Sequence, residues 1–532
     1  MRAGLTLAVA LVAAVAGSAE AQDRAPVVRV EQGRLTGTVQ DGIAAWRGVP
    51  YAAAPVGPLR WRPPQAPAAW SGRRAADALS PDCVQGRMPN LPGVRPTPPA
   101  QLSEDCLYLN VWRPQAVPRG RKLPVVVWIH GGAFVNGGSS DPMTWGDALA
   151  RRGLVVVTFN YRLGRLGFFA HPELTAEHPE DGRGNYGLMD QVAALDWVRR
   201  NIAAFGGDPA NVTVMGESAG GIAINLLAGA RPAEGLFDKA VILSGAGRDF
   251  LGSGRSLSQD APGALSAESQ GKALAARLGA TDLAALRALP ADRITGDLNM
   301  VTLVIGGPAA LFSGPILDGQ MVSRSLEAQY RANGQRPMPV IVGATSADLS
   351  LERASNKDAA FVQFGDRADE ARRLYDPTGD VAVDGINRAI GADRNMIEPA
   401  RFVARSFASQ GAPVFEYRFG YVANEKRAAA PWGADHASDV PYAFDRLQAA
   451  LDAPTPTDQA TATRFADYLA RFARTGNPNG DGLPQWPTYR TETDHLMSIR
   501  PDGAFVGEAD PLKARLDFIQ GAADRRWREQ PQ

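Results

Sequence analysis

The sequence predicts an α/β fold with a mostly parallel central sheet flanked by helices. Five short apolar runs have the length of strands that are buried on both faces. They cover residues 123–130, 154–161, 211–216, 239–245 and 338–343. Helical patterns lie between the runs, and the clearest is a stripe of apolar residues three or four apart, Leu188, Val192, Leu195, Val198 and Ile202. Strands that alternate with helices favour parallel pairing.

The composition is that of a soluble globular protein. Of the 532 residues, 45% are hydrophobic and 21% are charged, and the 56 Lys and Arg residues balance the 56 Asp and Glu residues. This charge balance argues against a nucleic-acid partner and favours a small, neutral or mildly polar substrate. No internal repeat or long charge run divides the chain. The Gly/Ser-rich stretch at 244–263 could be a linker, but a loop beside the site is favoured, so we expect residues 22–532 to form a single domain.

The N-terminus has the features of a secretory signal peptide. Arg2 precedes the apolar stretch LTLAVALVAAVAG, and Ala19-Glu20-Ala21 forms an A-x-A cleavage site before Gln22. The alternative is a membrane anchor, but the apolar stretch is short and rich in Ala and Gly for a span. We therefore expect cleavage after residue 21 and export to the periplasm or the medium, without a stable membrane anchor.

The chain has two cysteines, Cys83 and Cys106, on either side of a Pro-rich stretch. Export permits disulfides, and these two residues have no other cysteine to pair with. A bridge between them ties the Pro-rich stretch into a closed surface loop. The alternative is a pair of separately buried thiols.

A candidate nucleophile lies in the stretch VTVMGESAGG, where Ser218 has a glycine two residues away on each side. A G-x-S-x-G pattern between a strand and a helix is typical of a nucleophile elbow, which exposes the serine hydroxyl at the top of a sheet. The pattern alone is weak, so its value depends on a base, an acid and an oxyanion site elsewhere. Glu217, inside the elbow, is better suited to packing or hydrogen bonding behind the serine.

Chain order selects the histidine. A fold of this kind places the nucleophile, the acid and the histidine in that order. Of the five histidines, only His436 and His495 follow Ser218. His495 lies in an alternating, strand-like segment, whereas His436 lies in the loop-like PWGADHASDVPY. Catalytic groups favour loops on a rigid scaffold, so we predict His436 as the base.

The acid should lie between Ser218 and His436, on a loop after a strand. Asp348 is the first carboxylate beyond the strand that ends at Gly343, and Glu352 is the next. Asp318 is a third candidate, although Asp-Gly is typical of a turn. The carboxylate must hold the tautomer of the histidine and stabilise the imidazolium. We favour Asp348 and keep Glu352 as the alternative.

Backbone N–H groups for an oxyanion are predicted from IHGGAFVNGG, directly after the strand at 123–130. Gly131 and Gly132 allow close approach of the backbone to a substrate, and Ala219 follows the nucleophile. A phosphate-binding loop is excluded because no G-K-[ST] follows the glycines. The constellation requires neither a metal nor an organic cofactor.

Taken together, these segments resemble the type-B carboxylesterases, the cholinesterase-like branch of the α/β hydrolases. The resemblance extends over nearly the whole chain after residue 21. It rests on WRGVPYAAAPVGPLRWRPPQ, SEDCLYLNVW, GNYGLMDQVAALDWVRRNIAAFGGDPANVTVMGESAGG, HASDVPYAF and RFARTGNPNGDGLPQWPTY. It implies the α/β-hydrolase fold with loop and helix insertions around the site.

The same resemblance implies roles for individual residues. Ser218 becomes the nucleophile and His436 the base, the oxyanion donors become Gly131, Gly132 and Ala219, and Cys83 and Cys106 become the first disulfide of the family. One departure concerns the acid, because the family usually has Glu in a G-x-x-x-D-E-G run, whereas this chain reads GATSADLS with Asp348 at the matching position. Cholinesterase activity is not implied.

The predicted function is hydrolysis of small carboxylic esters through an acyl-enzyme, with a Ser-His-Asp triad. The alternatives are a related acyl transfer, such as thioester, carbamate or amide cleavage, and a non-catalytic recognition protein of the same fold. The sequence makes no prediction of the oligomeric state.

Overall fold

The computed structural model describes residues 25–88, 101–118, 120–179, 181–249, 254–305 and 313–529. The predicted signal peptide, residues 1–21, lies outside the described residues. Within the described ranges, no helix is both long enough and apolar enough to cross a bilayer.

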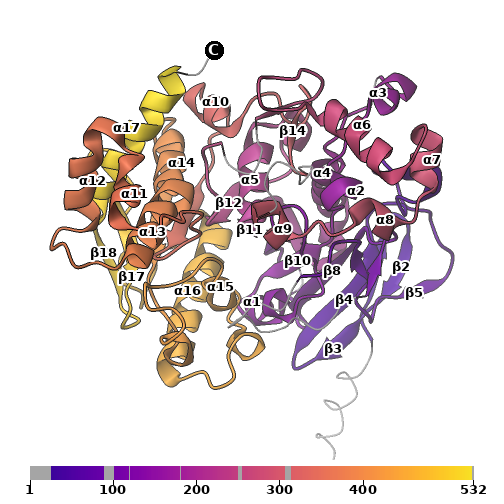
Figure 1. The fold of residues 1–532 in the computed structure, drawn as a ribbon. Helices are drawn as coiled ribbons and strands as arrows, with labels where there is room; N and C mark the ends of the chain where they lie inside the picture. The colour runs from indigo at the N-terminus through magenta and orange to yellow at the C-terminus, as the bar shows by residue number, and fades with distance from the viewer. Residues whose placement is uncertain are drawn as a thin grey trace, which may run out of the picture.

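The described chain is built around one sheet of 11 strands (Figure 1). In spatial order the strands are β18 (Phe505–Ala509), β17 (His495–Ile499), β16 (Val414–Phe419), β15 (Val340–Thr345), β12 (Lys239–Leu243), β11 (Gly207–Glu217), β9 (Leu123–Ile129), β10 (Val155–Phe159), β8 (Tyr108–Pro114), β4 (Ile43–Pro50) and β3 (Thr38–Gln40). Three small sheets accompany it: β1 (Val27–Val30), β2 (Gly33–Thr36) and β5 (Arg73–Ala75); β6 (Asp82–Cys83) and β7 (Leu102–Ser103); and β13 (Arg255–Ser256) and β14 (Ile316–Leu317).

Helices cover both faces of the central sheet (Figure 1). The α-helices of the described residues are α1 (Asp147–Arg151), α2 (Gly164–Gly167), α3 (Pro172–Glu177), α4 (Tyr186–Asn201), α5 (Ala219–Gly229), α6 (Ala267–Leu278), α7 (Leu283–Ala288), α8 (Ala291–Thr295), α9 (Met300–Ile305), α10 (Leu326–Arg331), α11 (Lys357–Val362), α12 (Ala368–Tyr375), α13 (Val383–Ala392), α14 (Glu398–Ala408), α15 (Val440–Ala443), α16 (Pro456–Thr475) and α17 (Lys513–Glu529).

The five predicted buried strands are confirmed as β9, β10, β11, β12 and β15. Together with β16 and β17 they form the parallel part of the sheet, in which every neighbouring pair from β10 to β17 is parallel. The edges differ, because β8, β4 and β3 at one end and β18 at the other pair antiparallel. The sheet is therefore mostly parallel, as predicted, with antiparallel edges.

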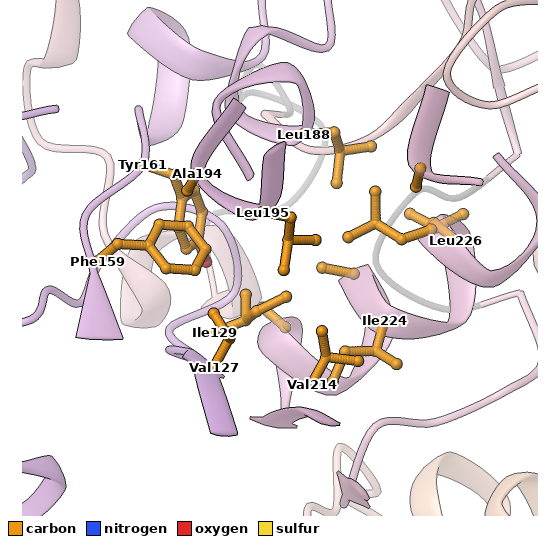
Figure 2. Close-up of a cluster of buried hydrophobic side chains, with 14 of the residues drawn as sticks. Val127, Ile129, Phe159, Tyr161, Leu188, Ala194, Leu195, Val214, Ile224 and Leu226 are labelled. Atoms are coloured by element: carbon orange, nitrogen blue, oxygen red, sulfur yellow. The ribbon is translucent and has the colours of Figure 1, made fainter. Parts of the chain in front are cut away.

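Alternation along β9 shows why the central strands are apolar throughout. Val127 and Ile129 contribute to a core beneath α4 and α5, whereas Val126 and Trp128 contribute to a second core that includes residues of α1 and α16. Successive side chains of a strand point to opposite faces, so a strand covered on both sides has no polar face. Figure 2 shows the first of these cores.

The predicted amphipathic helix is α4, which packs on β11 with Leu188, Leu195 and Val198 fully buried. Figure 2 shows Leu188 and Leu195 of this helix in the same hydrophobic cluster as Ile224 and Leu226 of α5. The α-helix ends at Asn201, and Ile202 begins a short 3₁₀ turn that closes with Gly206 in the left-handed region. A glycine with positive φ is a common way to end a helix.

The order of the strands brings the predicted site residues to one edge of the sheet. Strands β11, β12, β15 and β16 are neighbours and run parallel, so the loops after their carboxyl ends lie at one edge of the sheet. Ser218 follows β11, Asp348 follows β15, and His436 lies in the loop that follows β16. Ligands of parallel α/β sheets bind at this edge.

A buried carboxyl group on β16 opposes folding at neutral pH. Glu416 is 1% exposed, and neither of its side-chain oxygens has a hydrogen-bond partner among the described residues. Its pKa is raised from 4.5 to about 8, mainly by burial and further by Asp510, although Arg418 and Arg401 act in the opposite direction. The carboxyl is thus protonated in the folded protein at a pH at which the unfolded chain has released the proton.

Glu416→Gln should make the protein more stable, increasingly so as the pH rises from about 4.5 to 8. In that window the wild-type unfolded state loses a proton that the folded state keeps, so its stability falls by up to about 1.4 kcal/mol per pH unit. The neutral amide has no such loss. Guanidinium unfolding from pH 5 to 9 measures the difference, with exposed Glu492→Gln as the control. Parallel curves for wild type and Glu416→Gln would contradict the expectation.

Candidate functional site

Ser218 lies in a sharp turn between the end of β11 and the start of α5. Its backbone has φ 54° and ψ −122°, a conformation that L-residues rarely adopt, and its N–H donates to Leu243 O at 3.0 Å. The flanking glycines are required by close backbone contacts. A Cβ on Gly220 would lie 2.0 Å from Ile129 O, and a Cβ on Gly216 would lie 2.7 Å from Gly220 C. The predicted strand–turn–helix context of the serine is therefore present.

The turn after β9 runs beside the serine. A Cβ on Gly131 would lie 2.8 Å from Glu217 O, which is closer than real Cβ atoms come to a backbone atom, and 3.2 Å from Ser218 Cβ. Gly132, Ala133 and Phe134 follow with φ values of 106°, 54° and 62°. Consecutive residues in such conformations form concave arrangements of N–H groups that suit an anion. Ala219 is the first residue of α5, where N–H groups have no partner within the helix.

His436 and Asp348 form a close pair. His436 Nδ1 lies 2.6 Å from Asp348 Oδ1, and because an ionised carboxylate only accepts, Nδ1 carries the proton. Asp348 is fully buried and also accepts from Ser244 Oγ, Thr345 N and Leu349 N. Burial raises the pKa of Asp348, but the charge and hydrogen bond of His436 and the bond from Ser244 outweigh it, so its pKa is lowered. The carboxylate is thus held ionised, with all its partners as donors.

The other ring nitrogen of His436 faces Glu217. Nε2 lies 3.2 Å from Glu217 Oε1, and no hydrogen bond joins Nε2 to Ser218 Oγ among the described residues. Burial raises the pKa of Glu217 to about 8, an effect that the charge of His436 reduces. Burial lowers the pKa of His436, but Glu217 and Asp348 outweigh it and raise the pKa to about 9.

A third buried acid, Asp439, lies close to this group. Tyr417 Oη donates to Asp439 Oδ2 at 2.7 Å, and Asp439 is fully buried. The pKa of Asp439 is raised to about 6 by burial, although the hydrogen bond from Tyr417 acts in the opposite direction. Three carboxyl groups thus surround His436, and they differ in how strongly they hold a proton.

The alternative acids and base lie elsewhere. Glu352 Oε1 accepts from Arg394 Nη1 at 2.6 Å, so its carboxylate is engaged in an ion pair. Asp318 accepts from the N–H groups of Gln320 and Val322, as expected for the turn that its neighbouring glycine indicated. His495 is the first residue of β17, in the predicted strand.

Two residues that lie in the site, Ser244 and Ala133, were not predicted from the sequence. Ser244 is fully buried directly after β12, has φ 45°, and donates to Asp348 Oδ2 at 2.7 Å. Ala133 shares the left-handed turn of Gly132 without being glycine. The carboxyl end of β12, between β11 and β15, is a position that could have revealed Ser244. Ala133 has no such marker.

The predicted disulfide between Cys83 and Cys106 is confirmed, with an S–S distance of 2.04 Å. Cys83 ends β6, which pairs with β7 on the far side of the Pro-rich stretch, so two short strands and the bridge tie the ends of this stretch together. No cluster of three or more His, Cys, Asp or Glu side chains suited to a metal ion occurs in the part of the chain that is described.

Comparisons with known proteins give the family of the chain. The model of the carboxylesterase family matches residues 24–377 and 379–517. The fumonisin B1 esterase of Sphingopyxis macrogoltabida is 35% identical over 520 residues, which cover 94% of this chain and 90% of that protein. The para-nitrobenzyl esterase of Bacillus subtilis (strain 168) is 34% identical over 498 residues, covering 91% and 96%.

Solved structures of similar proteins extend the comparison to the fold. A structure of a PNB esterase superposes with a TM-score of 0.77 at 33% identity, covering 93% of this chain and 99% of that one. The Geobacillus stearothermophilus carboxylesterase EST55 at pH 6.2 superposes with a TM-score of 0.74 at 33% identity, covering 93% and 99%. The central sheet is therefore that of an α/β hydrolase, and the chain belongs to the carboxylesterase family of ester-hydrolysing enzymes.

Proposed function

We propose that Ser218 is the nucleophile of this carboxylesterase, with His436 as its general base and Asp348 as the carboxylate that orients the histidine. The observation that carries the proposal is the bond between His436 Nδ1 and Asp348 Oδ1, in a site where Ser218 occupies a strained turn. With its proton fixed on Nδ1, the neutral ring has its lone pair on Nε2, the atom that must accept a proton from a serine hydroxyl.

The reaction then proceeds in two acyl transfers. Ser218 Oγ attacks the ester carbonyl and its proton passes to His436 Nε2; the tetrahedral intermediate collapses, and the proton leaves with the alcohol. Water attacks the acyl-enzyme in the same manner and releases the acid. Asp348 stabilises the imidazolium in both steps and remains ionised, consistent with its lowered pKa.

The oxyanion is assigned to backbone N–H groups beside Ser218. Gly131, Gly132 and Ala219 are the predicted donors, and the left-handed run supports Ala133 as a further one. The N-terminus of α5 adds a favourable dipole for the negative charge, in the turn that follows Ser218 directly.

The substrate class is small carboxylic esters. Two relatives carry names for very different esters, fumonisin B1 and para-nitrobenzyl esters, so pocket shape rather than the catalytic group selects the substrate. The signal-peptide features of residues 1–21 support the proposal that the protein acts after export, in the periplasm or the medium. The exported chain would then be a single domain that begins at residue 22.

A fluorophosphonate probe tests the nucleophile. The serine oxygen should displace fluoride and retain the phosphonyl group, and mass spectrometry should locate it on the peptide that contains Ser218. Rates on matched oxygen esters, thioesters and amides then separate ester hydrolysis from the other acyl transfers. Labelling of another residue, with loss of activity in proportion, would refute the assignment.

The pH profile offers a further prediction. His436 must be neutral to accept the serine proton, and its pKa is raised to about 9 by Glu217 and Asp348. We therefore expect kcat/KM to fall as the pH drops below about 9. Glu217→Gln removes one of the two carboxylates and should move this fall to lower pH. Initial rates from pH 5 to 10 measure the shift. If kcat/KM of Glu217→Gln fell at the same pH as that of wild type, the prediction would be contradicted.

A further inference from the structure

Asn136 joins three separate segments through its side chain. It is 4% exposed, and its Nδ2 donates to Gly86 O at 2.8 Å and to Gln85 Oε1 at 3.2 Å. Its Oδ1 accepts from Met300 N, the first residue of α9, at 2.9 Å. One amide group therefore binds the turn after β9 to the loop after Cys83 and to the start of a helix some 160 residues later.

Gln85 reinforces the same junction from the other side. Its Nε2 donates to Gly137 O at 2.7 Å, and its Oε1 accepts from Gly137 N at 2.9 Å. The side-chain amide thus pairs with both polar groups of Gly137, as a neighbouring strand would. Nε2 also donates to Cys83 O, which connects the junction to the disulfide.

The backbone of Asn136 closes the turn that runs beside Ser218. The N–H groups of Val135 and Asn136 donate to Gly132 O at 3.0 and 2.9 Å. A Cβ on Gly132 would lie 2.1 Å from Asn136 O, so the two backbones are in direct contact. A displacement of Asn136 must therefore move Gly132, whose neighbour Gly131 is the residue in contact with Ser218.

We propose that Asn136, supported by Gln85, is a positioning residue that fixes the oxyanion turn at residues 131–136 against Ser218. The inference rests on the proposed function and adds to it a side chain that contacts neither the substrate nor the triad. Preorganised donors act because they require no reorganisation when charge develops, so a turn that is free to shift loses much of their effect. A misplacement of about 1 Å can cost about a hundredfold in rate.

Asn136→Ala should lower kcat by about tenfold to a hundredfold on 4-nitrophenyl acetate and leave KM within about twofold. A trifluoromethyl ketone, which forms an oxyanion on the serine, should bind more weakly by a factor similar to the loss in kcat/KM. The matched methyl ketone, which forms the oxyanion far less readily, should bind to Asn136→Ala as tightly as to wild type. Gln85→Ala should show smaller losses of kcat and of trifluoromethyl ketone affinity. If Asn136→Ala does not fold, Gln85→Ala alone tests the proposal.

Asn201→Ala is the matched control. Asn201 is also buried, at 3% exposed, and its amide links Glu31 N to Trp197 O, but it lies beyond the amino end of β11. It should lose thermal stability with unchanged kcat. The proposal is overturned if Asn136→Ala and Gln85→Ala match this control, or if kcat falls while the trifluoromethyl ketone binds as before. Failure of the proposed function is a separate result, because wild type would then form no adduct at Ser218.

Discussion

Ser218→Ala is expected to abolish ester turnover and to leave the fold intact. Loss of the nucleophile in subtilisin costs about a millionfold in kcat, and the same step is lost here. Alanine keeps the Cβ, so the backbone at φ 54° is no more strained than with serine. The exchange removes a single oxygen atom from a residue that is 8% exposed, so we expect little loss of stability. Steady-state rates and guanidinium unfolding, measured on the same preparation, check both halves of the expectation.

The control for this variant is Ser498→Ala in β17, another serine that is 8% exposed. It should retain full activity and lose a similar, small amount of stability. Turnover by Ser218→Ala within tenfold of wild type would remove Ser218 from the mechanism.

Asp348→Asn should lower kcat by about ten-thousandfold, the loss that the equivalent exchange causes in trypsin. The structure gives the reason. The partners of the carboxylate, Ser244 Oγ, Thr345 N, Leu349 N and His436 Nδ1, all donate to it. An amide places its NH₂ against at least one of these donors. If the NH₂ faces His436, the ring must take the tautomer with its proton on Nε2, which cannot accept from the serine.

Two companion variants sharpen this experiment. Glu352→Gln should have little effect, because Glu352 is paired with Arg394. Asp348→Glu should keep partial activity, since it restores the usual family residue at a fully buried position shaped for a shorter side chain. If Glu352→Gln were inactive and Asp348→Asn active, the acid would have to be reassigned while the roles of Ser218 and His436 stood.

The sequence predicts best where one physical requirement dominates. Strands buried on both faces must be apolar throughout, which is why β9, β10, β11, β12 and β15 were identifiable. The contacts of Gly216 and Gly220 likewise leave no alternative to glycine, so the elbow is visible as a pattern.

The sequence predicts least where the role of a residue depends on the position that the fold gives it rather than on its type. Ser244 holds Asp348 and Ala133 extends the left-handed turn, yet neither residue type marks its position. The antiparallel edge strands were not predicted either. In β4, for example, Arg47 and Gly48 interrupt the apolar pattern where the pairing with β8 shifts register.

The order of strands divides the proposed active centre between two parts of the chain. Strands up to β12 carry Ser218 and the oxyanion turn, strands from β15 onward carry Asp348 and His436, and only the parallel pair β12–β15 joins them within the sheet. A chain severed between these strands yields two fragments, each with a bare edge strand and neither with a complete triad. Ester cleavage then reports reassociation of the fragments, so this seam is a natural place to build a split enzyme. During synthesis, likewise, no activity can arise before His436, which lies in the last fifth of the chain, has emerged.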